Sequence, residues 1–113
     1  MLHNRDSASL LDILYSAKQI HHYIEGMDEE AFYQDEKTQS AVIHRILLIG
    51  EAANRVSKEF QTKHTNIPWR EIIGMRNLLI HTYDEVNLSM VWYAATHSVP
   101  GLIVLLEPLV PPP

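Results

Sequence analysis

Apolar residues recur three and four positions apart along most of the chain, which is the spacing of one face of an α-helix. The first series predicts a helix over residues 7–25, with Asp6 or Ser7 as its N-cap. Gly26 ends this helix, because glycine favours the turn that follows the last helical residue. The acidic stretch 27–36 is then expected to form a loop with a short helical turn.

Two further helices are predicted in the middle of the chain. Thr38 is the expected N-cap of a helix over residues 38–56. The polar residues 57–66 are expected to form a loop or a frayed extension of that helix. Pro68 is a helix-start signal, because proline is favoured in the first turn, where its missing N–H costs nothing. The pattern therefore predicts a third helix over residues 68–83.

The C-terminal part has the same helical spacing, interrupted by one Pro-Gly pair. Asn87 is the expected N-cap of a fourth helix, and Pro100-Gly101 is expected to kink or restart it, with a short fifth helix over residues 102–106. No strand-like alternation, internal repeat or glycine-rich phosphate loop occurs. The predicted fold class is all-α: a four-helix bundle with a short fifth helix, formed by one domain over residues 1–110 with a tail at 111–113.

Composition and charge restrict the classes of function. The chain has 113 residues, 46% of them apolar and 20% charged, which fits one globular domain with its own core. It has no cysteine, so disulfides and thiolate metal sites are excluded. The net charge of −5 argues against broad, non-specific binding to nucleic acid. Residues 58–113 are nevertheless almost neutral, with five acidic and four basic residues.

Two sequence features bear on the expected location of the protein. Its N-terminus lacks the charged-then-apolar layout of a signal peptide. The apolar run 99–106 is shorter than the ~20 residues that span a bilayer. We therefore expect a soluble, cytoplasmic protein without a membrane partner.

The predicted third helix carries the candidate chemistry. On an ideal helix, with about 100° per residue, Arg76 lies in the middle of an apolar stripe. The other members of this stripe are Trp69, Ile72, Ile73, Met75, Leu79, Ile80 and Tyr83. A charge there is costly unless it is paired. Either the arginine stem packs and its head reaches water, or the head meets a carboxylate on a second helix or subunit, for which Glu51 is the candidate.

A polar face lies roughly 100–160° away on the same helix. It includes Asn77 and His81, which are four residues apart and can share a hydrogen bond. It also includes Gly74, which costs about 1 kcal/mol in a helix interior and is either simply tolerated or marks the close approach of a ligand or helix. The six other histidines form no ligand spacing with one another, so no metal site is expected.

Arg76 and His81 point about 140° apart on an ideal helix. One chain would therefore not easily bring both side chains to a single phosphate. A two-fold dimer solves this problem if the third helices of both copies meet at one seam, because arginine and histidine from both chains then line the same cleft.

The segment from Arg76 through His81 to Tyr83 resembles the R-x4-H-x-Y motif of HepT toxins, one form of the R-x4-6-H signature of HEPN domains. The likeness continues over roughly residues 7–107. Residues 49–53 (Ile-Gly-Glu-Ala-Ala) resemble the family's Gly-Glu-Ala helix. Flanking similarity also covers the approach to the motif at 67–77 and the last helices, with Val91-Trp92 and the Val-Pro-Gly-Leu break at 99–102.

This resemblance implies a HEPN-type bundle that forms a homodimer, with its site at the dimer interface. It implies a metal-independent endoribonuclease toxin that needs no cofactor and cleaves RNA, for example tRNA or mRNA. It also implies a partner, an MntA-like minimal nucleotidyltransferase antitoxin, which would silence the toxin by transferring AMP to the hydroxyl of Tyr83. ATP would be the antitoxin's substrate.

The residue types fit such a reaction. RNA carries its own nucleophile, the 2′-OH. His81, with an ordinary pKa of about 6.5, can take that proton or protonate the leaving oxygen. Arg76 can stabilise the negative charge that develops on the phosphate. Asn77 and Glu51 are the candidate supporting residues, the first by orienting the imidazole or binding phosphate.

Three other interpretations stay open. A HEPN scaffold could partner a nucleotidyltransferase without cutting RNA, which the net charge of −5 slightly favours. A purely structural helical dimer would need Arg76 for stability alone. An antitoxin role is disfavoured, because the Gly-Ser and Asp-x-Asp features of a nucleotidyltransferase do not occur.

Overall fold

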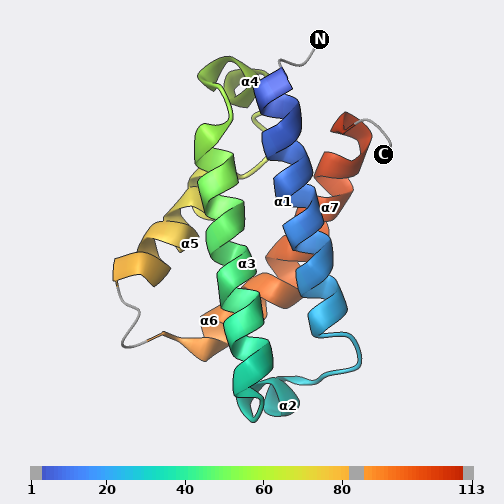
Figure 1. Cartoon of the computed structure of the whole chain (residues 1–113), viewed down its shortest axis with the longest axis vertical. Coiled ribbons are helices and arrows are strands. Elements are labelled where there is room, and N and C mark those ends of the chain that lie inside the picture. The colour runs from blue at the N-terminus through green and yellow to red at the C-terminus, as the bar shows by residue number, and fades with distance from the viewer. Residues whose placement is uncertain (1–3, 82–85, 111–113) are drawn as a thin grey trace.

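The structure is a computed structural model that describes residues 4–81 and 86–110, and this part of the chain is helical, without a strand. Its α-helices are α1 (Asn4–Tyr23), α2 (Glu29–Tyr33), α3 (Glu36–Arg55), α4 (Lys58–Lys63), α5 (Trp69–His81), α6 (Leu88–Tyr93) and α7 (Val99–Leu106) (Figure 1). A π-helical turn, η2 (Ala94–Ser98), joins α6 to α7, and a 3-10 turn, η3 (Glu107–Leu109), follows α7. The predicted all-α helical bundle is confirmed.

The central helix of the bundle is α3. It runs antiparallel to α1 and packs against α1 on one side and α5 on the other, while α7 packs against α1 (Figure 1). The largest fully buried side chains are Leu10, Ile13, Ile20, Phe32, Val42, Ile67, Val91 and Leu106. Because these apolar side chains come from most of the helices, the core fixes α3 firmly, and α3 in turn supports α5.

The start of α1 differs from the prediction. The helix begins at Asn4, so Asp6 lies within its first turn, and neither Asp6 nor Ser7 is the N-cap. The Asp6 carboxylate, which is 2% exposed, instead accepts hydrogen bonds from the amide of Ser57 at 2.8 Å and from its hydroxyl at 2.7 Å. Asp6 therefore ties the start of α1 to the junction between α3 and α4.

The N-caps of α3 and α4 also differ from the predictions. Asp35, and not Thr38, is the N-cap of α3, because its carboxylate accepts hydrogen bonds from the amide of Thr38 at 3.0 Å and from its hydroxyl at 2.8 Å. The hydrogen bond from the Thr38 backbone amide is the main reason that the pKa of the Asp35 carboxyl lies below its ordinary value. The segment expected to be a loop or frayed extension contains a separate helix, α4, whose N-cap Ser57 accepts from the amide of Phe60. The short helical turn predicted within 27–36 is α2.

The last helix does not break at the Pro-Gly pair. As predicted, Asn87 is the N-cap of α6. From there α6, η2 and α7 follow one another without a gap, and α7 contains Pro100 and Gly101 instead of starting after them. Proline inside a helix lacks one amide and crowds the carbonyl four residues earlier. The wider π-helical turn directly before α7 accommodates this interruption.

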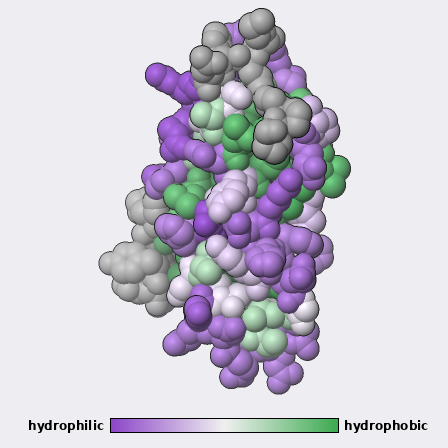
Figure 2. All heavy atoms as spheres, turned by 45° about the vertical axis from the view of Figure 1, so that its right-hand side comes forward, coloured by the Kyte–Doolittle hydropathy of each residue, from purple (hydrophilic) through white to green (hydrophobic). Residues whose placement is uncertain are grey.

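The continuity of this segment bears on the membrane question. Within the described residues one helix, Leu88–Leu109, is long and apolar enough to cross a membrane by length and composition alone. Core helices of soluble proteins meet the same criterion, and this one places Val91, Ala95 and Leu102 in the core. The face shown in Figure 2 is mainly polar, with apolar side chains gathered in its upper half. The cytoplasmic location stays a prediction.

Candidate active site

The position of α5 is set at its first residue and along one face. Trp69 is buried, and its indole N–H donates to the carbonyl of His64 at 3.0 Å. The indole ring also packs edge-on against Phe60 of α4. Further along, Leu79 is buried and Ile72 packs against the core. The predicted apolar stripe therefore faces α3 and the core wherever its side chains are described.

Arg76 meets α3 at a notch made by Gly50. A Cβ atom added to Gly50 would overlap the Cβ of Arg76 and would lie only 2.8 Å from its Cγ and 3.3 Å from the carbonyl oxygen of Ile72. Carbon atoms in contact lie about 3.5–4.0 Å apart, so any side chain at position 50 would have to displace α5. The missing side chain of Gly50 is what allows the arginine stem to lie against the backbone of α3.

The head of Arg76 is held incompletely. Its Nη1 donates to Oδ1 of the neighbouring Asn77 at 2.8 Å. Its Nε–H is buried, and no described group accepts a hydrogen bond from it. A buried donor without an acceptor costs about 1–3 kcal/mol. The guanidinium therefore sits beside α3 with a donor that a phosphate or carboxylate oxygen from another molecule would satisfy.

Glu51 is not the acceptor in this chain. It is exposed and borders a groove on the α1 side of α3. Among the described residues no ion pair joins Glu51 to Arg76. On α3 it is the preceding residue, Gly50, that faces the arginine. The expected pair does not form within one chain, and a pair between subunits stays a prediction.

The polar face of α5 has the predicted exposure where it is described. Asn77 and Gly74 are both exposed. A Cβ on Gly74 would meet nothing within 4 Å, so no described element of the same chain requires glycine there. His81 is the last residue of α5, and its side chain lies outside the described structure. Tyr83 also lies outside the described residues, so convergence of the motif side chains stays a prediction.

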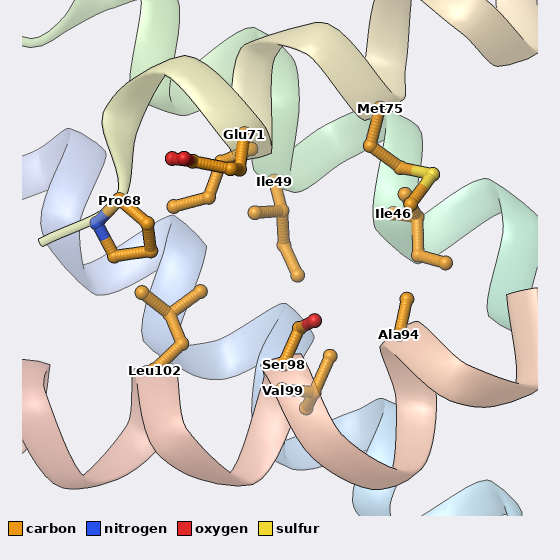
Figure 3. A pocket seen from close by; sticks show the side chains of 10 residues that line it. Ile46, Ile49, Pro68, Glu71, Met75, Ala94, Ser98, Val99 and Leu102 are labelled. Carbon is orange, nitrogen blue, oxygen red and sulfur yellow. The ribbon is translucent and has the colours of Figure 1, made fainter. Parts of the chain in front are cut away.

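An apolar cavity of about 230 Å³ lies between α3, α5, η2 and α7, and Ile46 and Ile49 of α3 are among the residues that line it (Figure 3). Met75 of α5 lies across it from Ala94, Val99 and Leu102 (Figure 3), and Ile72 of α5 also lines it. Two polar side chains, Glu71 and Ser98, also line it. The helix that bears Arg76 is thus tightly packed on α3 at Gly50 and loosely packed where it borders this cavity.

Metal ligation has no obvious site in the part of the chain that the structure describes. Within residues 4–81 and 86–110, no group of three or more histidine, aspartate or glutamate side chains is placed to hold a metal ion.

The role of Gly50 is the feature that the periodicity did not identify. A glycine in the interior of a twenty-residue helix costs about 1 kcal/mol relative to alanine. This cost is the signal in the sequence that could have indicated a special role for Gly50. The same signal at Gly74 pointed to a position without a close neighbour. Distinguishing the two glycines required the packing of α5 on α3.

The ribonuclease HepT-like family model matches residues 13–109. A Thermococcus cleftensis protein named "Probable ribonuclease HepT" is 37% identical over 93 residues, which are 82% of this chain and 84% of the relative. A Methanocaldococcus jannaschii protein named "Putative RNase MJ1380" is 34% identical over 95 residues, which are 84% of this chain and 87% of the relative. No solved structure matches the chain significantly. With its helical bundle and these matches over most of its length, the chain belongs to the ribonuclease HepT-like family.

Proposed function

We propose that the chain is a metal-independent endoribonuclease toxin whose site combines Arg76 and His81 at the interface of a homodimer. Membership of the ribonuclease HepT-like family supports the class of reaction. The observation that carries the proposal is the seat of Arg76: its stem fits the Gly50 notch and its Nε–H lacks an acceptor among the described residues. An arginine held in this way is prepared to bind an oxyanion.

The reaction needs one nucleophile, one anion-stabilising group and one proton carrier. The 2′-oxygen of the RNA attacks the adjacent phosphorus, and the bond from phosphorus to the 5′-oxygen breaks. His81 takes the 2′ proton or gives a proton to the leaving 5′-oxygen. Arg76 donates to the phosphate oxygens as charge develops on them. The products are a 2′,3′-cyclic phosphate and a 5′-OH end.

Helix geometry supports the proposed dimer. Residues 76 and 81 lie about 140° apart around an α-helix, and α5 is helical over both positions. Arg76 packs against α3, so on an ideal helix one chain would not easily bring both side chains to the same phosphate. Two copies related by a two-fold axis can supply the arginine from one chain and the histidine from the other.

The same proposal includes regulation by an MntA-like nucleotidyltransferase, which transfers AMP to the hydroxyl of Tyr83. The bond formed joins the tyrosine oxygen to the α-phosphorus of ATP, and pyrophosphate leaves. The added nucleotide brings bulk and negative charge near Arg76 and excludes RNA. Tyr83→Phe should therefore keep cleavage while abolishing the mass increase caused by the antitoxin. A Tyr83→Phe protein that the antitoxin still silences would contradict this mechanism.

Cleavage in the absence of metal tests the activity itself. The wild-type chain and His81→Ala are incubated with total RNA in EDTA, and the 3′ ends of the fragments are analysed. We expect cleavage by the wild type only, with cyclic phosphate ends. Absence of His81-dependent cleavage would favour the second candidate, a HEPN module that binds a nucleotidyltransferase without cutting RNA, which the net charge of −5 supports.

A further inference from the structure

A second hollow, separate from the Arg76 seat, lies between α1 and α3. It has a volume of about 240 Å³, and the side chains used below are Asp12, Tyr15 and Ser16 of α1 and Arg45, Glu51 and Arg55 of α3. Pockets for whole small molecules usually measure about 300–1,000 Å³. This α1–α3 groove is therefore better matched to one unit of a polymer than to a free drug-sized ligand.

Arg45 is the best-held cation of the groove, yet all its partners are neutral. Its guanidinium carbon lies 5.1 Å from the centre of the Tyr15 ring. Its Nε is 3.4 Å from the hydroxyl of Tyr23, and its Nη1 is 3.5 Å from the hydroxyl of Ser16, which is itself buried. Both hydrogen bonds are long, and among the described residues no carboxylate forms an ion pair with Arg45. The positive charge is positioned without being neutralised.

Tyr15 offers an aromatic surface in the same place. The side chain is 56% exposed although it is large and apolar. Arg45 covers one face of the Tyr15 ring, so a planar group can stack on the exposed part of the ring. Stacking on exposed aromatic side chains beside arginine is how proteins bind the bases of single-stranded nucleic acids.

The remaining charges of the groove balance. Arg55 pairs with Asp12 at 3.4 Å, in an exposed and therefore weak ion pair. Glu51 adds a second carboxylate, so the two arginines face two acids. A simple anion gains little from a neutral groove. A nucleotide gains more, because its phosphate meets an arginine while the amino group of its base donates to a carboxylate.

We propose that the α1–α3 groove binds one nucleotide of single-stranded RNA, with its base stacked on Tyr15, its phosphate on Arg45 and its amino group on Glu51. The proposal rests on the ribonuclease function proposed above. Glu51 follows Gly50 on α3, but Glu51 lines the α1–α3 groove whereas Gly50 touches Arg76 of α5, so the groove and the arginine seat lie on different faces of the same helix. The groove would bind a nucleotide of the substrate away from the cleaved bond and favour bases that carry an amino group over uracil.

Mononucleotide binding tests this assignment apart from cleavage. CMP, UMP and inorganic phosphate are each titrated into the ¹⁵N-labelled full chain, and amide shifts of Tyr15, Ser16 and Leu48 are followed. We expect CMP to bind more tightly than UMP and phosphate to cause little change. Tyr15→Leu and Arg45→Met should each weaken CMP binding by about fivefold or more, and Glu51→Gln should reduce the preference for CMP over UMP.

A matched control is Lys58→Met, which removes a positive charge from the exposed surface of α4 and should leave CMP binding unchanged. Thermal unfolding checks that each variant folds. If Arg45→Met does not fold, Tyr15→Leu still tests the proposal, because Tyr15 is exposed and its replacement should not disturb the fold. Equal shifts with phosphate and CMP would reduce the groove to an anion site and overturn the proposal. Unchanged CMP binding together with loss of the dimer in Tyr15→Leu would instead make the groove an interface between copies. If CMP binds as predicted but no RNA is cut in EDTA, the nuclease proposal fails and the nucleotide site stands.

Discussion

Two contact regions of α5 are packed in opposite ways. Toward α3, the absence of one side chain at Gly50 brings Arg76 against the backbone of its neighbour. Toward α7, the same helix leaves an apolar cavity of about 230 Å³. The helix that carries the candidate chemistry is thus located by one close contact and is loosely covered elsewhere. Changes at the close contact should disturb function far more than comparable changes at open positions.

The largest effect is expected from Gly50→Ala, with Gly74→Ala as its matched control. The new methyl group at position 50 overlaps Arg76, so α5 must shift, and overpacking of this kind typically costs about 1–3 kcal/mol. Displacement of the arginine should also reduce cleavage by about 100-fold or more. At position 74 a methyl group meets nothing, and the gain in helix propensity should stabilise the protein by up to about 1 kcal/mol. Chemical unfolding and cleavage rates measure both; equal behaviour of the two variants would remove the distinction between the glycines.

Arg76→Lys should reduce activity almost as strongly but leave stability nearly unchanged. Lysine keeps the charge and loses both the planar donor array and the Nε–H that lacks an acceptor. Removing one donor to a developing oxyanion costs about 10²–10³ in rate. Single-turnover cleavage of a defined RNA gives the rate, and thermal unfolding gives the stability. A lysine variant with wild-type rates would mean that charge alone is needed at this position.

Asp6→Ala is expected to lower stability without affecting the site, because Asp6 lies away from α5. The buried carboxylate accepts two hydrogen bonds from Ser57. A hydrogen bond to a charged group contributes about 1.5–3 kcal/mol to stability. We expect a loss of stability in that range in urea unfolding. Ser57→Ala removes the α4 cap and the hydroxyl bond to Asp6 but keeps the amide bond, so it should cost a comparable amount, with about 1 kcal/mol of it from the lost cap. Cleavage per folded molecule should not change in either variant.

The smallest effect is a pH dependence at the start of α3. The pKa of Asp35 is lowered in the folded chain, mainly by the Thr38 amide. A lowered folded pKa means that its contribution to stability is fully present above the unfolded value of about 3.9 and is lost as the pH falls through the folded value. The stability difference between wild type and Asp35→Ala should therefore be constant near neutral pH and shrink below about pH 4. A difference that persists at the lowest pH would contradict the capping role of the ionised form.

Local patterns predicted most of the fold. The spacing of apolar residues placed four of the helices to within a few residues, and Asn87 marked the start of α6. The misplaced features depend on distant residues. Asp6 has the side chain of an N-cap but bonds to Ser57, fifty-one positions away, and Pro100 is tolerated because a π-helical turn precedes it.

The candidate site was predictable only in part. The helical wheel predicted that Arg76 lies in the apolar stripe. It also predicted that Asn77 lies on the exposed polar face. The partner of the arginine did not, because Glu51 and Gly50 are adjacent in sequence and face different helices. Only the packing of α5 on α3 distinguishes a carboxylate that points away from a glycine that makes room.

The most direct test of the composite site is complementation between two inactive variants. Arg76→Ala and His81→Ala are each expected to be inactive, and their chains are mixed by co-expression, purified as dimers and assayed on RNA in EDTA. If each site takes its arginine from one chain and its histidine from the other, every mixed dimer contains one intact site of two, so verified mixed dimers should recover about one half of the wild-type activity. No recovery in verified mixed dimers would contradict the account, because it would place both residues of each site in the same chain.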